Sequence, residues 1–408
     1  MAVKKRVWTT AKGEHREAWV VDYRDGNKKR RLKTFAKKRD ADAFAASSKI
    51  QLKDGTHIPD RAGVTIAQAG ELWIEAAQLA GREQTTIAQY RQHLDLHIKP
   101  LIGEMRITTL TIAQARQFSD DLRAKVSPAM VRKVMTSLGS LIGDAIERGL
   151  ATNNVVRDLR TRRGAIDNRA AKRAKRQLRV GVDIPTRDEI KAILAHVPAR
   201  YYAAIVMAAF TGMRASELRG LQWTAVNLNS NNVHIYQRAD RFNNFGPPKS
   251  DAGERMIPLP PPAVDALKAW RKNCPKGDLN LVFPNLDGGV LSHTQLQRDG
   301  FETAQVAAGV TRPGKDRRGK AVALPKYTGL HALRHWFASW CINSVADGGR
   351  GLDAKRVQAL LGHSSIKMTL DLYSHLFPAK DDHEELHRAT AFFMESAPSD
   401  GDILETQT

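Results

Sequence analysis

The chain has 408 residues and carries 64 Lys plus Arg against 43 Asp plus Glu, which gives a net charge of +21 and a pI near 10.1. A charge this far from zero indicates a polyanionic partner, and two cysteines cannot form the disulfide framework of a small secreted fold. No apolar segment follows the basic start at residues 1–10, and the longest mostly apolar run, residues 201–210, is about half a membrane span. We therefore expect a cytoplasmic, nucleoid-associated protein of two or three domains that has no membrane partner.

Two segments hold most of the excess positive charge. Residues 1–60 and residues 157–179 each have a formal charge of +8, whereas the last 29 residues carry two basic and eight acidic side chains. One basic run usually marks a solvated face, but two separated runs in a chain of this pI favour contact with phosphates.

The N-terminal segment predicts a small sheet followed by a helix. Residues 3–34 alternate as strands do, with a hairpin turn at Asp25-Gly26, and residues 37–52 show a helical apolar stripe. Because eight of the twelve residues from Lys28 to Arg39 are basic, we expect residues 1–60 to bind DNA, although a basic extension without a binding role would look similar. The side chains expected to contact DNA here are Lys28, Lys29, Arg30, Arg31 and Lys33.

The next block, residues 64–156, predicts a bundle of four helices. Capping residues such as Thr65, Thr111 and Ser127 open its amphipathic segments. A basic stretch with few bulky apolar residues follows, and we interpret residues 157–182 as a linker that lies along the DNA backbone. The linker residues expected to contact DNA are Arg160, Arg162, Arg163, Lys172 and Arg173.

Residues 183–385 predict a mainly helical domain with a small antiparallel sheet, followed by a C-terminal tail, residues 386–408. Thr186 and Glu189 have the spacing of a capping box, so a helix is expected to begin there. Extended segments are expected near 233–237 and 255–259, and helices at 262–272, 292–308, 331–346 and 354–361.

Thirteen histidines invite a search for metal sites, but their spacing supports none. His331 and His335 are four residues apart on a predicted helix, yet no acidic third ligand lies nearby and there is no Cys-x-x-Cys pair. The phosphate-binding loop of nucleotide hydrolases and the nucleophile elbow of serine hydrolases are also missing. We expect no metal and no cofactor.

Four fragments in the second half form a stronger signal together than any of them does alone. The first fragment is Thr211–Leu218, which contains Arg214 and Glu217, and the second runs from His331 to Arg334. The third is Leu361–His363, and the fourth is Tyr373, ten residues later. His331 and Arg334 share one face of a predicted helix. Gly362 is expected to end a helix and to expose His363 just past it.

This ordered set resembles the tyrosine recombinase family, of the phage-integrase type. The family pattern has Arg in Thr-Gly-x-Arg-x-x-Glu-Leu, then His-x-x-Arg, Leu-Gly-His and a tyrosine about ten residues later. The family also uses a lysine on a hairpin, which Lys249 in Pro248–Ser250 resembles, although Lys272 and Lys276 are also available. Three departures are Trp336, where Thr or Ser is common, Asn153-Asn154, where Asn-Pro is usual, and a basic insertion, Thr311–Lys326.

The resemblance implies a mainly α fold with small β-sheets and three DNA-binding parts. Residues 1–60 look like the arm-type DNA-binding domain of the larger integrases, 64–156 like their helical core-binding domain, and 183–385 like the mixed α/β catalytic domain. The implied partners are double-stranded attachment sites, a homotetramer on DNA, and an accessory excisionase or DNA-bending protein. The implied function is site-specific recombination that integrates and excises a mobile element.

Elementary chemistry gives each fragment a role in phosphoryl transfer. A phenol such as Tyr373 must lose its proton as it attacks phosphorus, because its pKa is roughly 10. Arg214 and Arg334 can hold the non-bridging oxygens with fixed forks that keep their charge. His331 and His363 titrate near neutrality and can bond the phosphate or move a proton. Lys249 can protonate the leaving oxygen, and Glu217 can orient Arg214.

Several residues keep a second interpretation at this stage. His335 and His375 are expected to pack or to support the site without acting in catalysis, and Arg255 is expected to contact phosphate outside the site. Tyr327 is a rival nucleophile with poorer spacing. Three rival functions are a type IB topoisomerase, a DNA-binding regulator without catalysis, and a metal-dependent nuclease.

Overall fold

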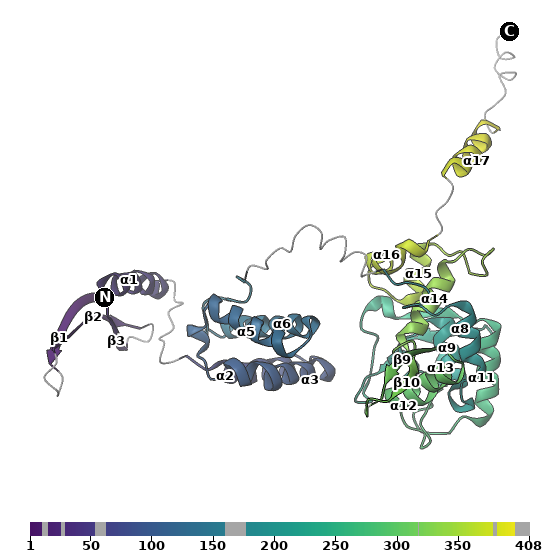
Figure 1. Ribbon diagram of the computed structural model, residues 1–408, viewed down its shortest axis with the longest axis horizontal. Coiled ribbons are helices and arrows are strands. Elements are labelled where there is room, and N and C mark those ends of the chain that lie inside the picture. Colours follow the sequence, from purple (N-terminus) through teal and green to yellow (C-terminus); the bar gives the residue numbers. More distant parts are fainter. Residues whose placement is uncertain are drawn as a thin grey trace, which may run out of the picture. The chain divides into compact units, whose positions relative to one another are not determined.

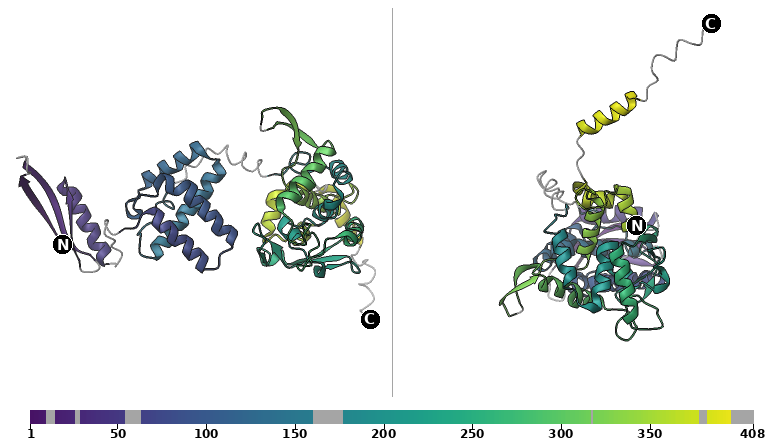
Figure 2. Two further views of the ribbon diagram at one scale, coloured as in Figure 1. Left: turned by 90° about the horizontal axis from the view of Figure 1, so that it is seen from below. Right: turned by 90° about the vertical axis from the view of Figure 1, so that its right-hand side faces the viewer.

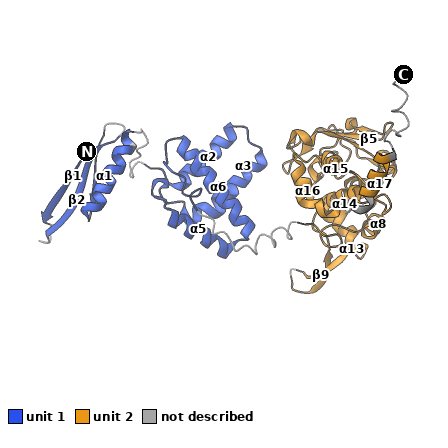
Figure 3. Cartoon of the chain, turned by 90° about the horizontal axis from the view of Figure 1, so that it is seen from above, with its two compact units in different colours: residues 1–163 blue, residues 164–408 orange. Residues whose placement is uncertain are grey.

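The computed structural model describes residues 1–9, 15–25, 29–53, 63–159, 177–316, 318–377 and 382–395. The chain divides into two compact units, residues 1–163 and 164–408 (Figure 3). Its many helices and small sheets confirm the predicted fold class. Within the ranges given above, no helix has both the length and the apolar character needed to cross a bilayer.

The N-terminal part of unit 1 is a three-stranded antiparallel sheet with one helix on it (Figure 1). The strands are β1 (Ala2–Thr9), β2 (His15–Arg24) and β3 (Arg30–Phe35), and the helix is α1 (Lys38–Lys53). Val21 and Tyr23 pack against Ala41 and Phe44 of α1. Because neighbouring residues of a strand face opposite sides, the register leaves a second face without a helix. That face carries Lys4, Arg6, Arg16 and Arg30.

The rest of unit 1 is a helical bundle. Its α-helices are α2 (Ile66–Leu79), α3 (Gln84–His93), α4 (Lys99–Ile102), α5 (Ile112–Lys125) and α6 (Pro128–Glu147). Capping boxes at Thr65 and Thr111 confirm two of the predicted helix starts, and the Ser127 hydroxyl caps α6. The bundle buries an apolar core that includes Trp73 and Phe118.

Unit 2 packs helices around one large apolar core with small sheets at its edge (Figure 1). The helices that frame the core are α8 (Arg187–Ala195), α9 (Ala199–Thr211), α10 (Ala215–Arg219), α11 (Pro261–Asn273), α14 (His331–Ile342), α15 (Ala354–Leu361) and α16 (Ile366–Tyr373). One antiparallel sheet has the order β4 (Val226–Asn227), β5 (Asn232–Ile235), β8 (Arg255–Pro258). A two-stranded pair, β6 (Arg238–Ala239) and β7 (Phe245–Gly246), lies before β8 in the chain.

Three segments of unit 2 differ from the prediction in detail. The single helix expected at 292–308 is α12 (His293–Gln295) and α13 (Thr303–Ala307) joined by a π-helical turn. The basic insertion forms a hairpin, β9 (Thr311–Lys315) and β10 (Ala321–Pro325). A further helix, α17 (Asp382–Glu395), lies beyond α16 in the chain.

Candidate active site

Arg214 is placed by the turn between α9 and α10. Gly212 ends α9 with φ +62°, and a side chain there would collide with the ring of Phe337 on α14, so a glycine lets the turn approach that helix. Arg214 then caps α10, because Glu217 accepts from its backbone N–H at 2.9 Å and from its guanidinium Nη1 at 2.8 Å. One carboxylate therefore fixes both the helix start and the direction of the arginine.

Arg334 comes from α14 and is almost completely buried, with 2% of its surface exposed. Its guanidinium donates to the carbonyl of Gly212 at 2.6 Å and to the carbonyl of Leu361. Arg334 therefore joins the α9–α10 turn to the end of α15.

The C-terminal end of α15 collects three arginines. The carbonyls of Leu360, Leu361 and Gly362 accept from Arg255 (2.7 Å), Arg334 and Arg214 (3.1 Å), respectively. Carbonyl groups at a helix C-terminus have no partner within the helix and carry partial negative charge. The end of α15 thus orients three guanidiniums that come from three different elements.

Arg255 is a member of this cluster that the sequence interpretation placed outside it, and that expectation is wrong. The residue is 9% exposed on β8, and it donates to both carboxylate oxygens of Glu217, at 2.9 and 3.3 Å. A third bond runs to the carbonyl of Gly253 at 2.7 Å. The alternation of β8 could have indicated burial, since Ile257 faces the same side and is in the core.

Positive charge exceeds negative charge in this cluster. Burial acts to raise the pKa of Glu217, but Arg255 and Arg214 outweigh that effect and hold the pKa below its ordinary value. Burial, with Arg214 nearby, lowers the pKa of Arg334 to about 9, so Arg334 keeps its charge at neutral pH. Two of the three guanidiniums, those of Arg214 and Arg255, pair with Glu217, whereas Arg334 bonds backbone carbonyls. Such a set suits a bound anion such as a phosphodiester.

His363 follows the α15 glycine but is buried, contrary to expectation. Only 5% of its surface is exposed, and its Nδ1 lies 2.9 Å from the Thr369 hydroxyl of α16. The sequence pattern located the helix end correctly, yet it could not show that α16 folds back over the residue. Burial, with Arg334 nearby, lowers the pKa of His363 to about 3, so the imidazole is neutral at pH 7.

His331 and His335 lie one turn apart on α14, with ring centroids 4.8 Å apart and ring planes nearly perpendicular. Part of His331 is exposed at the protein surface. The protein nevertheless keeps water from much of its ring, and this desolvation, together with Arg334 and Arg214, lowers its pKa. Burial, with His331 nearby, lowers the pKa of His335 to about 4. Both rings are therefore neutral at pH 7.

Tyr373 is the last residue of α16 and is 1% exposed. Its hydroxyl is hydrogen-bonded to His335 Nδ1 at 2.7 Å, and burial raises its pKa. His335 was predicted to pack or to support the site, and the structure makes it a direct partner of this phenol. The sequence signal was the helical spacing from His331, which puts both imidazoles on one face.

The rival tyrosine, Tyr327, belongs to the fold and not to the arginine cluster. Its hydroxyl donates to the Glu189 carboxylate at 2.7 Å, and burial together with that carboxylate raises its pKa. Glu189 also caps α8 and pairs with Lys326 at 2.5 Å. This network gives Tyr327 a structural role.

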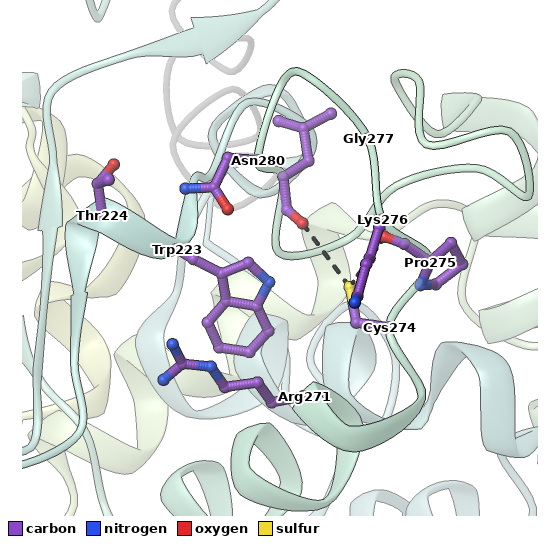
Figure 4. A pocket seen from close by; sticks show the side chains of 9 residues that line it. Trp223, Thr224, Arg271, Cys274, Pro275, Lys276, Gly277 and Asn280 are labelled. Atoms are coloured by element: carbon purple, nitrogen blue, oxygen red, sulfur yellow. Dashed lines mark hydrogen bonds between the residues drawn. The ribbon is translucent and has the colours of Figure 1, made fainter.

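Lys249 lies on an exposed stretch between β7 and β8, apart from the buried cluster. A side chain at Gly253 would collide with the neighbouring Pro248, so this stretch packs on the residue whose carbonyl holds Arg255. The alternative lysine Lys276 lines a different pocket of about 580 Å³, beside Cys274 and Arg271 (Figure 4). The structure therefore brings together Arg214, Glu217, His331, Arg334, His363 and Tyr373, and places Lys249 on the exposed stretch that leads to Arg255.

The N-terminal residues predicted to contact DNA have partners within their own module. Arg30 pairs with Asp22 at 2.6 Å, Arg31 pairs with Asp25 at 2.8 Å, and the Lys33 ammonium lies 4.2 Å from the centroid of the Phe44 ring. Lys29 is exposed. The remaining members of the prediction lie outside the described residues: Lys28, Arg160, Arg162, Arg163, Lys172 and Arg173.

Sequence profiles match both helical parts of the chain. The phage integrase family profile matches residues 185–380, and the profile of the phage integrase N-terminal SAM-like domain matches residues 65–123. The prophage phiRv2 integrase of Mycobacterium tuberculosis (strain ATCC 25618 / H37Rv) is 26% identical over 376 residues, which cover 89% of this chain and 90% of that protein. The tyrosine recombinase XerC of Xanthomonas campestris pv. campestris (strain 8004) is 26% identical over 277 residues, or 67% and 72% of the two chains.

Two solved structures share the fold. The Tn1549 transposon integrase (residues 82–397) in complex with a circular intermediate DNA aligns with a TM-score of 0.58 at 18% identity and covers 81% of this chain and 100% of that chain. A lambda integrase dimer bound to a COC′ core site aligns with a TM-score of 0.55 at 18% identity, covering 92% and 95%.

Fold, cluster and matches together define an enzyme that breaks and rejoins DNA. The chain belongs to the phage integrase family and is a tyrosine-type site-specific recombinase.

Proposed function

We propose that the protein integrates and excises a mobile element by recombining two specific duplex DNA sites. The observation that carries this proposal is the set of three arginines that converge on the end of α15, immediately before the helix that holds Tyr373. The relatives support the mobile-element part, because they include a prophage integrase and a transposon integrase.

The chemical step is a transesterification at one phosphodiester. The Tyr373 oxygen attacks phosphorus, a Tyr–O–P bond forms, and the bond to the 5′-oxygen breaks to leave a 3′-phosphotyrosyl end and a 5′-hydroxyl. A 5′-hydroxyl of the partner duplex reverses the step, so the energy of the phosphodiester is conserved and no ATP is consumed. Arg214 and Arg334 stabilise the charge that gathers on the non-bridging oxygens; loss of one such donor typically costs about 3–4 kcal/mol.

Protons move at two atoms in this step. With its proton on Nε2, neutral His335 can accept from the Tyr373 hydroxyl, whose oxygen lies 2.7 Å from Nδ1, and the imidazole then takes the phenol proton as the new bond forms. The departing 5′-oxygen needs a proton from the other side, and Lys249 on its exposed stretch supplies it. His331 and His363 donate hydrogen bonds to the phosphate, and Glu217 orients Arg214.

Two whole-chain features accompany this chemistry. The uncovered face of the N-terminal sheet, with Lys4, Arg6, Arg16 and Arg30, binds arm-type sites, and the basic segment 157–182 follows the backbone between domains. The active assembly is a homotetramer on two sites, assisted by an excisionase and a DNA-bending protein.

Covalent trapping tests the proposal. The protein is incubated in EDTA with a nicked attachment-site duplex, and a denaturation-resistant protein–DNA adduct is measured for the wild type and for Tyr373→Phe. We expect an adduct that is lost in the variant. No adduct with the cognate site would favour a regulator without catalysis, an adduct that persists in the variant would move the nucleophile to Tyr327, and relaxation of supercoils at any sequence would favour a topoisomerase.

A further inference from the structure

We propose that the β9–β10 hairpin is an additional DNA-binding arm of the catalytic unit, which contacts phosphates of the duplex beyond the bond that is cut. This inference rests on the proposed function, because it takes duplex DNA as the substrate. The hairpin coincides with the basic insertion at residues 311–326, to which neither the family pattern nor the reaction assigns a role.

The hairpin is a narrow ribbon that extends away from the core of unit 2 (Figures 2 and 3). Its five residue pairs run from Thr311–Pro325 to Lys315–Ala321. Directly opposed residues share a face, so one face carries small side chains, Pro313, Ala321 and Ala323, beside Lys315. A thin two-stranded ribbon of this kind fits against or within a DNA groove.

The turn of the hairpin is built by its one acidic residue. The Asp316 carboxylate accepts from the backbone N–H groups of Arg318 and Lys320, both at 2.9 Å, and Gly319 takes a positive φ of 81°. These bonds use backbone atoms, so the turn holds without the basic side chains. The side chains of Arg318 and Lys320 remain exposed at the tip.

Four exposed cations, Arg312, Lys315, Arg318 and Lys320, lie on this ribbon. In the portion of the chain that the structure describes, none of the four forms an ion pair. Positive side chains without acidic partners on an exposed ribbon suit binding to a polyanion such as DNA.

The base of the hairpin is fixed close to the catalytic helix. Lys326 pairs with Glu189, Tyr327 bonds the same carboxylate, and Gln305 bonds both backbone groups of Tyr327, at 2.8 and 3.1 Å. His331, the first residue of α14, follows four residues later. DNA held by the ribbon is thereby held at a set distance from His331 and Arg334.

The test compares two double variants that remove the same charge. Lys315→Ala/Lys320→Ala removes both exposed lysines named on the ribbon and leaves Arg312 and Arg318, and Lys191→Ala/Lys268→Ala removes two exposed lysines from α8 and α11. Binding of the full chain to a long attachment-site duplex is measured across a salt series. For the ribbon variant we expect a dissociation constant raised about tenfold near 0.15 M salt and a salt slope lower by about 2, since each lost phosphate contact removes about 0.9 from the slope.

Hydroxyl-radical footprinting should also show lost backbone protection for the ribbon variant alone. Equal salt slopes and footprints for the two variants would overturn the inference. Adduct formation on the nicked substrate at saturating protein separates the two proposals. A ribbon variant that binds weakly but still forms the Tyr373 adduct supports both proposals. A wild-type protein that binds DNA and forms no adduct overturns the proposed function, and the salt slopes and footprints then decide the ribbon proposal.

Discussion

His335 is the residue whose place in the structure changes the chemistry most. The family pattern predicts a nucleophile and phosphate ligands, and the structure adds an imidazole 2.7 Å from the Tyr373 hydroxyl, which the proposed mechanism uses as the proton acceptor. A buried phenol with a raised pKa needs such an acceptor to react at neutral pH.

Replacement of His335 by Ala should therefore slow adduct formation by about 10²- to 10⁴-fold, the usual range for loss of a general base. Single-turnover kinetics on the nicked substrate measure this rate, and DNA affinity should change little. Because the pKa of His335 is about 4, the wild-type rate should not fall through titration of this residue until the pH approaches that value.

His375→Ala is the matched control, because that exposed imidazole is hydrogen-bonded to the Leu178 carbonyl and not to Tyr373. Equal rates for the wild type and His335→Ala would show that this hydrogen bond holds the Tyr373 side chain in the DNA-free protein and takes no part in the reaction.

At the residue scale, the motifs singled out arginines, histidines and a tyrosine that the structure brings close together, and their catalytic roles stay predictions. Burial was not predictable in the same way. His363 was expected to be exposed, and Arg255 was expected to lie outside the cluster. Both expectations failed because each residue's burial depends on a contact that its local sequence does not show: Thr369 of α16 bonds His363, and Glu217 binds Arg255.

Gly362 shows at the element scale how one backbone position shapes the site. It ends α15 with φ +64°, and an added Cβ would lie 2.9 Å from the Ala252 carbonyl oxygen and 3.0 Å from the Arg255 guanidinium. The carbonyls before and at this residue hold three arginines, so a shift of the turn changes all three.

Gly362→Ala should destabilise the catalytic unit by about 1–2 kcal/mol and reduce the adduct rate at saturating DNA by more than tenfold. Gly149→Ala is the control, because Gly149 has φ +69° after α6 and nothing lies within 4 Å of an added Cβ. The control should show the backbone cost without the rate loss. A normal rate for Gly362→Ala would mean that the arginines tolerate movement of the α15 end.

Helix starts were the most predictable elements, since the capping boxes at Thr65, Thr111 and Thr186 act within four residues. The β9–β10 hairpin was not predicted. Its strands are rich in Gly, Pro and Ala, which have low strand propensity, and its base is held by an ion pair from Lys326 to Glu189 of α8, far away in the sequence.

The stability of the catalytic unit should depend on pH at the scale of the whole molecule. The pKa of His363 is about 3 in the folded protein, below the ordinary 6.5, so the unfolded chain binds more protons between these values and stability rises with pH there. Acidification from pH 7.5 to 5 should lower the local free energy of unfolding by about 2 kcal/mol from this residue alone. Hydrogen exchange of α15 and α16 amides, corrected for the intrinsic effect of pH, measures the change.

His363→Asn should flatten this dependence, because it keeps a polar group beside Thr369 without a titrating ring. The same slope in the variant would assign the effect to other groups.

The end of α15 and the start of α16 are separated by only the short segment from Gly362 to Ser365. The anchor for the arginines and the helix that ends at Tyr373 are consequently one continuous piece of backbone. A pull on the chain just after Tyr373 would disturb both together, so the enzyme has few ways to be half assembled. Such all-or-none behaviour suits an enzyme that breaks and rejoins DNA, because a displaced segment would remove the strand-breaking group and its arginines together.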